Sequence, residues 1–273
     1  MRMLSYTLPL SSNSRWSHCR TGEASGVSIS GQAQFDGFVV TELAVRGTAS
    51  RDTCVFFSDL HWIGENPPLY ERMATVMNAS EADWILFGGD ACAFMDTMGG
   101  ALSWLGGLRA RKGKLAVLGN REAHIEWHSS QFWREIYSEA GYELLRNEAR
   151  VADSLSFYGV DDFRYGTPDW SGLPTGGFCI SLSHNPDAVA EWDGPVGNLA
   201  LCGHTHGGQM VWPALGPLYT SSKYGRQFLC GMSVRDDGAL EYTSSGVGES
   251  GFGILHRRVN CPREILRIRF IGD

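Results

Sequence analysis

Seven short apolar runs along the chain each end abruptly in polar residues. They are rich in β-branched and aromatic residues and span residues 39–45, 53–59, 84–90, 114–120, 154–160, 178–184 and 199–204. Apolar runs of this length, bounded by turn-like sequences, predict strands that are mostly buried. The chain is therefore expected to contain a largely buried sheet.

Two segments between these runs have helical periodicity. PLYERMATVMNASEAD begins at Pro68 and repeats apolar residues at helical spacing, with proline at its favoured first position. A second helix is predicted from Glu122 until Gly141 interrupts the pattern. Strands that alternate with helices indicate βα units, and the later hairpin-like segments indicate a mixed second sheet. A layered α/β fold follows.

The length of 273 residues admits one large domain or two small ones. No repeat or low-complexity linker divides the chain, so a single domain over residues 1–273 is expected. The hydrophobic content of 43% excludes a disordered chain. The N-terminal segment MRMLSYTLPLSSNS is too interrupted for a signal peptide, and no window is apolar enough for a membrane span.

The formal net charge is −7, and no run of Lys or Arg forms a polybasic arm. This pattern argues against a nucleic-acid partner and against a basic strip on anionic lipid. The seven cysteines are spread singly without a CxxC pair, which indicates a reducing, cytoplasmic location. The 34 glycines exceed the usual share and are expected in turns and at close backbone approaches.

Five of the predicted strands end in carboxylate, amide or imidazole side chains. These residues are Asp59, His61, Asp90, Asn120, His184, His204 and His206. Because ligands bind at the carboxyl ends of strands in open α/β sheets, the side chains are expected to converge. Residues two apart in an extended segment point to the same side, so each His–x–His or Asp–x–His pair can supply one site. An ordinary polar strand end explains any one of them alone, but not five together.

Oxygen and imidazole ligands without thiolate suit Mn²⁺, Fe or Zn²⁺ better than Ca²⁺ or an iron–sulfur cluster. Seven ligands are too many for one catalytic ion that keeps a position open for water. Two divalent ions bridged by one carboxylate account for the whole set, as in sites that clamp a phosphoryl group. We expect Mn²⁺, with Fe or Zn²⁺ as alternatives.

The segments SDLH, GGD, GNRE, SLSHNPD and GHTHGGQ resemble, in order and spacing, the five motifs of the calcineurin-like metallophosphoesterases. The resemblance covers residues 59–209 and continues weakly into SSGVGES and RRVNCPREILRIRF. It implies a four-layer α/β/β/α sandwich of two mixed β-sheets flanked by helices. It also implies one ion on Asp59, His61 and His206, a second on Asn120, His184 and His204, and Asp90 as the bridge.

The chain departs from the family at Arg121, because most members have GNH followed by an acid, and that histidine protonates the leaving oxygen. Arginine cannot donate a proton near neutral pH. Either the leaving group needs no proton, or another residue supplies it. A nucleoside monophosphate leaving a diphosphate can depart as an anion, and Arg121 would then bind phosphate bidentately. The GNR-acid variant resembles the UDP-2,3-diacylglucosamine pyrophosphatases of lipid A biosynthesis, which release UMP and a lipid sugar phosphate.

Two alternatives for this position stay open. His124 and His128, one turn apart on the predicted helix, are substitutes for the missing acid, unless they only form a solvated helix face. Arg121 would otherwise pair with Glu122 or Asp90.

Further residues are candidates for contacts with substrate or membrane. Trp62, Arg164 and Tyr165 are candidates for uracil or sugar contacts, although aromatic residues at such positions are commonly core or rim residues. Segment 210–226 combines Trp, Leu and Tyr with Lys223 and Arg226, which suits an acylated substrate or peripheral contact with the inner face of a membrane. Packing onto the second sheet is the alternative for this segment.

The leading hypothesis is a dinuclear metal-dependent hydrolase of UDP-2,3-diacylglucosamine, in which Arg121, Asp90 and His124 are the candidates for catalysis. A metal-dependent phosphodiesterase or phosphatase of other specificity is the second hypothesis. A non-catalytic scaffold with the same fold is the third, and the presence of every ligand position argues against it. The sequence gives no indication of the oligomeric state.

Overall fold

The computed structural model describes residues 15–19, 22–64, 67–125, 129–217, 219–251 and 257–272. One sheet has eight strands, of which β5, β6, β7 and β8 run parallel to one another. In spatial order they are β2 (Glu23–Ala24), β3 (Val27–Phe35), β4 (Phe38–Val45), β17 (Arg263–Phe270), β5 (Thr53–Phe57), β6 (Trp84–Phe87), β7 (Gly113–Ala116) and β8 (Glu143–Leu144).

A second, seven-stranded sheet is also mixed, because β10, β11, β12 and β16 pair in parallel and the outer pairs are antiparallel. Its order is β1 (Trp16–His18), β15 (Gly231–Arg235), β16 (Leu240–Thr243), β12 (Leu199–Cys202), β11 (Phe178–Ser183), β10 (Leu155–Gly159) and β9 (Glu148–Ala152). A separate short hairpin consists of β13 (Val211–Trp212) and β14 (Gly216–Pro217).

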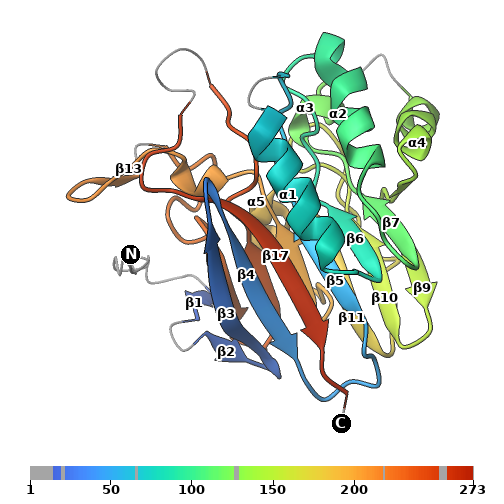
Figure 1. Ribbon diagram of the computed structural model, residues 1–273. Coiled ribbons are helices and arrows are strands. Elements are labelled where there is room, and N and C mark those ends of the chain that lie inside the picture. The colour runs from blue at the N-terminus through green and yellow to red at the C-terminus, as the bar shows by residue number, and fades with distance from the viewer. Residues whose placement is uncertain are drawn as a thin grey trace.

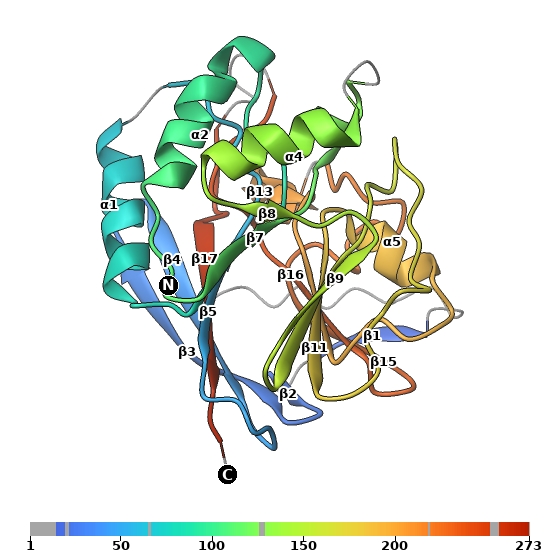
Figure 2. The ribbon, with the colours of Figure 1, turned by 90° about the vertical axis from the view of Figure 1, so that its right-hand side faces the viewer.

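Helices cover the outer faces of both sheets, so the molecule has four layers, α/β/β/α (Figure 2). The eight-stranded sheet carries α1 (Pro67–Ala79), α2 (Met98–Gly106) and α4 (Ser130–Glu139), of which α1 runs alongside β17 and β5 in Figure 1. The seven-stranded sheet carries α5 (Pro186–Glu191). Three short elements complete the description: α3 (Asn120–Ala123), η1 (Met95–Thr97) and η2 (His206–Gly208). The predicted fold class is confirmed.

The central strands are apolar along their whole length because both of their faces are buried. In β5, Cys54 and Phe56 point into the core between the sheets, whereas Val55 and Phe57 point toward the helices. In β12, Leu201 faces the inter-sheet core and its neighbours face the α5 side. This two-sided burial explains the continuous apolar runs in the sequence. All seven predicted strands are present.

The prediction of one helix from Glu122 to Gly141 is wrong. The helix α3 ends at Ala123, and a new helix, α4, begins at Ser130. The Ser129 side chain accepts a hydrogen bond from the Phe132 backbone amide at 3.2 Å, which caps the new helix. Apolar residues keep helical spacing across both helices, so the sequence pattern did not indicate that a new helix begins here. In the described part of the chain, no helix is long and apolar enough to cross a membrane.

Candidate metal centre

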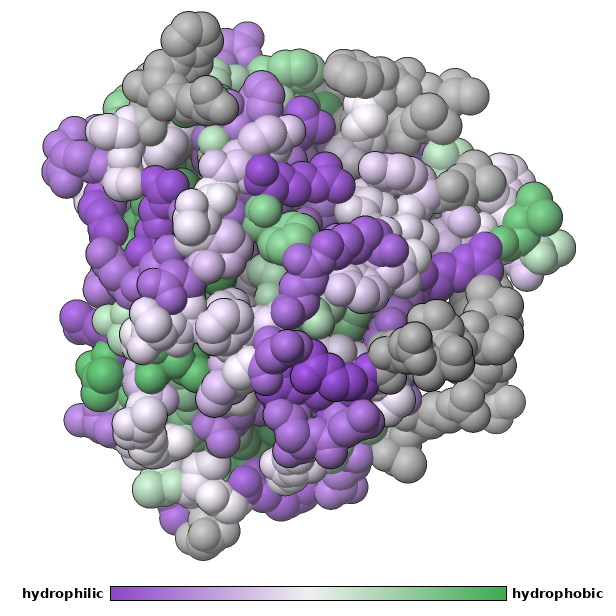
Figure 3. Space-filling view, turned by 180° about the vertical axis from the view of Figure 1, so that it is seen from behind, coloured by the Kyte–Doolittle hydropathy of each residue, from purple (hydrophilic) through white to green (hydrophobic). Residues whose placement is uncertain are grey.

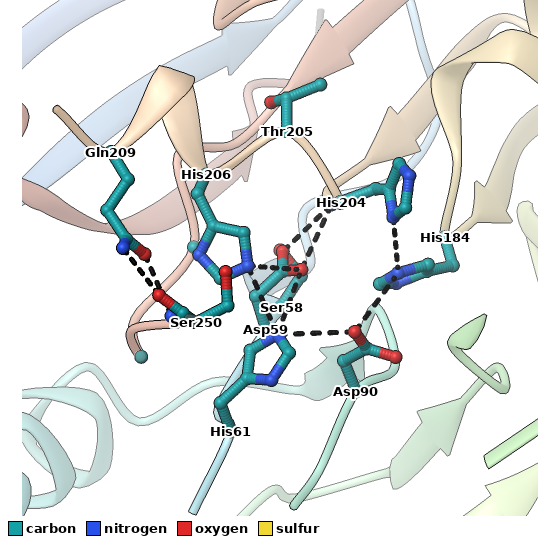
Figure 4. A network of polar contacts seen from close by, with 12 residues as sticks. Ser58, Asp59, His61, Asp90, His184, His204, Thr205, His206, Gln209 and Ser250 are labelled. Carbon is teal, nitrogen blue, oxygen red and sulfur yellow. Dashed lines mark hydrogen bonds and ion pairs between the residues drawn. The ribbon is translucent and has the colours of Figure 1, made fainter. Parts of the chain in front are cut away.

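The structure brings together all seven side chains that end the predicted strands. Those from β5, β6 and β7 belong to the eight-stranded sheet, and those from β11 and β12 belong to the other, so the carboxyl ends of both sheets meet here. Figure 4 shows the cluster, Asn120 excepted. The histidine and aspartate side chains in it are almost fully buried.

The first group is Asp59, His61 and His206. The two imidazole Nε2 atoms lie 3.1 Å apart, and His206 Nε2 lies 3.5 Å from Asp59 Oδ1. Two more contacts hold Asp59 in place, from the His204 backbone amide at 3.0 Å and from the Ser58 hydroxyl at 2.6 Å. The three ligand atoms lie close enough together to surround one ion.

The second group is centred on His184, whose Nε2 lies 3.2 Å from Asn120 Oδ1, 3.2 Å from His204 Nδ1 and 3.6 Å from Asp90 Oδ2. The other ring nitrogen of His184 lies 2.8 Å from the Gly88 carbonyl oxygen and donates to it. This bond leaves the Nε2 lone pair free for a metal, as is usual for metal-binding histidines.

Asp90 connects the two groups through a single oxygen. Its Oδ2 lies 3.2 Å from His61 Nε2 in the first group and 3.6 Å from His184 Nε2 in the second. Its other oxygen, Oδ1, accepts the Arg121 backbone amide at 2.8 Å. The carboxylate therefore has one oxygen fixed by the backbone and one that faces both groups.

The spacing and chemistry of these atoms fit divalent ions. Ligands at about 2.1 Å from a tetrahedral ion lie about 3.4 Å from one another, and the contacts above scatter around that separation. The Nε2 atoms of His61 and His206 face each other, and a cation placed between them could accept the lone pairs of both rings. The donor set holds oxygen and nitrogen but no sulfur, as expected for Mn²⁺, Fe or Zn²⁺.

The electrostatics of the cluster also favour cations. Burial alone would lower the pKa of His61, but hydrogen bonds to Asp59 and Asp90 outweigh it and raise the pKa to about 9. Burial and repulsion from His184 lower the pKa of His204 to about 3. Burial would raise the pKa of Asp59, yet the surrounding histidines hold it well below its usual range. Two buried carboxylates thus draw positive charge to this site, from protons or from metal ions.

The backbone is strained where it presents these side chains. Five of the candidate ligands have φ in the left-handed region, which side chains other than glycine rarely adopt. They are Asp59 (56°), His61 (41°), Asp90 (59°), His204 (70°) and His206 (53°). Such strain costs about 1–3 kcal/mol per residue and persists where the surroundings impose it, commonly at functional sites.

Two glycines allow the ligand loops to approach one another. A Cβ atom at Gly119 would overlap the Asp90 carboxylate and backbone, and one at Gly203 would overlap Ser58 and Asp59. The expectation that glycines serve close backbone approaches at the strand ends is met at both positions.

Glu122 has a role that the sequence analysis missed. Its carboxylate accepts the backbone amides of Ala91 (2.6 Å), Gly119 (3.0 Å) and Asp90 (3.1 Å), and the Tyr137 hydroxyl at 3.2 Å. It therefore ties the loop after β6 to the loop after β7. A partial sequence signal existed, because an acid three residues after the residue that precedes a helix can accept that residue's backbone amide, as in the acidic half of a capping box.

Two other charged residues near the site, Asp162 (buried) and Arg258 (half-buried), gave no clear signal in the sequence. Arg258 donates to the carbonyl oxygens of Ser245 (2.7 Å) and Gly248 (2.8 Å) and lies 3.4 Å from His206 Nδ1. Burial lowers the pKa of Arg258. Asp162 accepts the backbone amides of the two residues that follow Phe163, at 2.9 and 2.8 Å, and so fixes the loop that carries them.

Arg121 and His124 line a cavity of about 350 Å³ beside this cluster. The Arg121 side chain is exposed and has no ion pair or hydrogen bond to any residue that the structure describes. Pairing with Glu122 or Asp90 is therefore wrong. The His124 ring meets Tyr165 edge to face at 4.8 Å. His128 lies outside the described residues.

The candidate substrate residues differ in position. Tyr165 lines the cavity, and Arg164 donates to the Ser221 carbonyl oxygen at 3.1 Å. Trp62 packs against Tyr70 at 4.9 Å in the core beneath the helices and does not line this cavity. Its ring contributes to the core, and its assignment to the substrate stays a prediction.

Within segment 210–226, residues 211–217 form the β13–β14 hairpin, which projects in Figure 1, and Figure 3 shows apolar residues at the tip of that projection. Trp212 is 44% exposed, and Leu215 and Tyr219 are each 69% exposed. Packing onto the second sheet is therefore wrong for these three side chains. Lys223 pairs with Glu191. Leu218 lies outside the described residues.

The chain matches no protein-family model. It is 31% identical over 229 residues to the metallophosphoesterase YkuE of Bacillus subtilis, which covers 78% of this chain and 73% of that protein. It is 27% identical over 229 residues to the phosphodiesterase YaeI of Escherichia coli, over 80% of this chain and 81% of that protein. The UDP-2,3-diacylglucosamine pyrophosphatase LpxG of Chlamydia trachomatis is 26% identical over 152 residues, 50% of this chain and 44% of that protein. A solved structure of a 5'-nucleotidase from Staphylococcus aureus aligns with a TM-score of 0.40 and 9% identity, over 81% of this chain and 55% of that one.

Proposed function

We propose that this chain, which belongs to the metallophosphoesterase family, hydrolyses the diphosphate of UDP-2,3-diacylglucosamine to UMP and a lipid sugar phosphate. The family makes it a metal-dependent hydrolase of phosphoester or diphosphate bonds. The observation that carries the finer proposal is the exposed Arg121 guanidinium, which has no partner among the described residues and lies beside the ligand cluster, where most of the family has a histidine.

Two divalent ions are proposed, with Mn²⁺ favoured. Asp59, His61 and His206 would hold the first ion, and Asn120, His184 and His204 would hold the second. Asp90, whose Oδ2 faces both groups, would be the ligand that they share. When bound, such ions polarise phosphoryl oxygens and lower the pKa of water.

The residues around the leaving group fit a diphosphate better than an alkyl diester. The backbone of Arg121 is fixed, because its amide donates to Asp90, and its guanidinium, which no described residue contacts, can bind phosphate. A nucleoside monophosphate leaves as an anion and needs no donated proton. Arg121 would stabilise that charge. His124 lines the same cavity and is the substitute if the leaving group requires an acid.

A phosphodiesterase of other specificity is the second candidate. It is supported by the similarity to the phosphodiesterase YaeI, which covers 80% of this chain, whereas the similarity to LpxG covers 50%. A scaffold is disfavoured, because burying two adjacent carboxylates is costly unless they bind cations.

The test is to incubate Mn²⁺-loaded protein with UDP-2,3-diacylglucosamine and to measure UMP release. We expect UMP, with slower cleavage of bis(p-nitrophenyl) phosphate. Rapid cleavage of the diester without UMP release would replace the proposal by the second candidate.

The exposed hairpin supports a further part of the proposal, that the protein meets its lipid substrate at the inner face of a membrane. Leu215 and Tyr219 expose apolar surface that lipid would cover. We expect wild-type protein to co-sediment with phosphatidylglycerol vesicles and the Leu215→Ser variant to remain in the supernatant. Equal sedimentation of the two proteins would contradict this contact.

A further inference from the structure

The cavity beside the ligand cluster has walls from three separate parts of the chain. Residues 92–95 come from the loop after β6, residues 120–125 from α3 and its flanks, and Tyr165 from the loop after β10. Asn120 belongs both to this wall and to the second ligand group, 3.2 Å from His184. The cavity therefore opens directly onto the place where a phosphoryl group would lie.

The rim of this cavity is apolar and exposed. Phe94 is 54% exposed, Tyr165 is 46% exposed, and Met95 is 38% exposed. Single exposed apolar residues are normal in proteins, but a group around one concave site indicates a binding surface. Arg121 stands among them as a cation with no partner in the described residues.

The orientation of Tyr165 is fixed from two directions. The Asp162 carboxylate accepts its backbone amide at 2.8 Å, and the His124 ring meets its ring at an interplanar angle of 82°. Edge-to-face packing of this kind holds a ring in a defined plane. Tyr165 thus presents a preorganised aromatic surface to the cavity.

We infer that this cavity binds a planar aromatic ring on the leaving group, which is the nucleobase when the substrate is a nucleoside diphosphate derivative. The inference rests on the proposed function. Arg121 contacts the phosphate of the departing nucleotide, and Tyr165 and Phe94 contact its base. These two aromatic residues then determine which leaving groups the enzyme accepts.

The size and lining of the cavity favour a ring over acyl chains. Its volume of about 350 Å³ is near the lower limit of the range of roughly 300–1,000 Å³ for small-ligand sites. A sugar with two long acyl chains needs more room. Stacking on aromatic side chains is the usual means of recognising a base without a dedicated set of hydrogen bonds.

The test compares UMP with ribose 5-phosphate, which has the same sugar and phosphate but no base. Binding of each to Mn²⁺-loaded protein is measured by isothermal titration calorimetry, which does not require turnover. We expect UMP to bind about tenfold more tightly than ribose 5-phosphate. In Tyr165→Ala the two affinities should differ by less than about twofold, and the affinity for inorganic phosphate should be unchanged.

Two variants control for indirect effects. Tyr165→Phe keeps the ring and should keep the preference for UMP. Phe35→Ala removes a ring at the end of β3 that stacks on Phe38 at the start of β4, and this variant should bind both compounds like the wild type.

Equal binding of UMP and ribose 5-phosphate by the wild type would overturn the inference. So would a preference that survives in Tyr165→Ala, or tighter binding of dodecyl phosphate than of UMP, which would assign the cavity to an acyl chain. A clear preference for UMP without cleavage of UDP-2,3-diacylglucosamine would leave the inference standing and remove the proposed substrate.

Discussion

Replacing Glu122 by glutamine should weaken metal binding although no candidate ligand is replaced. Oε1 of Glu122 accepts from the Ala91 amide and the Tyr137 hydroxyl, and Oε2 accepts from the Asp90 and Gly119 amides. Glutamine has only one acceptor oxygen. Its best arrangement keeps that oxygen on the Asp90 and Gly119 side and turns the amide nitrogen toward Tyr137, whose hydroxyl can accept.

The Ala91 amide then faces a donor and loses its bond. A buried unsatisfied amide costs about 1–3 kcal/mol, so Glu122→Gln should lower the free energy of unfolding by about 2 kcal/mol. Tyr137→Phe removes one bond and should cost about 1 kcal/mol. In the double variant the costs should not add, because Tyr137 is the partner of the new amide.

Urea unfolding of the metal-free proteins measures these differences, and calorimetric titration with Mn²⁺ measures the effect on the site. We expect Glu122→Gln to bind Mn²⁺ about 10–100-fold more weakly, as is typical when a residue that orients ligands is lost. The matched control is Glu139→Gln, the same change on an exposed side chain. If Glu122→Gln unfolds and binds Mn²⁺ like this control, then the carboxylate does not tie the two loops together.

Three further predictions concern pH, the leaving group and the metal. Burial raises the pKa of Glu241 from 4.5 to about 8, so the folded protein keeps a proton that the unfolded chain releases, and stability falls as pH rises between these values. Glu241→Gln should therefore unfold at higher urea than the wild type at pH 9 but not at pH 4.5; equal midpoints at pH 9 would contradict this. Arg121→His should gain activity on bis(p-nitrophenyl) phosphate and lose it on the diphosphate in parallel assays, and the reverse change would refute the leaving-group argument. Removing Mn²⁺ with a chelator should lower the melting temperature, because a ligand at 100 times its Kd adds about 2.7 kcal/mol to the free energy of unfolding. Calorimetric scans that coincide with and without metal would exclude a tightly bound ion.

The parts of the fold that the sequence predicted are those governed by local pattern. A strand buried on both faces is apolar throughout, so its end is visible where Asp59 or Asp90 interrupts the run. Carboxyl ends of parallel strands share an edge, so the ligands carried by one sheet are expected to lie together, and the packing of the two sheets then brings both edges to one place. The strand ends and the candidate site could therefore be predicted together.

The parts that the sequence did not predict depend on contacts between distant segments. Glu122 lies in a helical pattern, and nothing local shows that its carboxylate reaches the loop after β6. Trp62 follows a candidate ligand directly, yet its ring turns to Tyr70 in the core. The sequence also did not show that Arg121 lacks a partner within the described ranges, because the carboxylate of Glu122 accepts backbone amides instead.

The bridging role of Asp90 is the central claim, and metal counting tests it most directly. Wild-type protein and the Asp90→Asn variant would be loaded with Mn²⁺, freed of excess ion and analysed by elemental mass spectrometry, with turnover measured on the same samples. The account predicts two ions per wild-type chain, and at most one ion with turnover no higher than that of metal-free protein in the variant. Two ions and near-normal turnover in Asp90→Asn would contradict it.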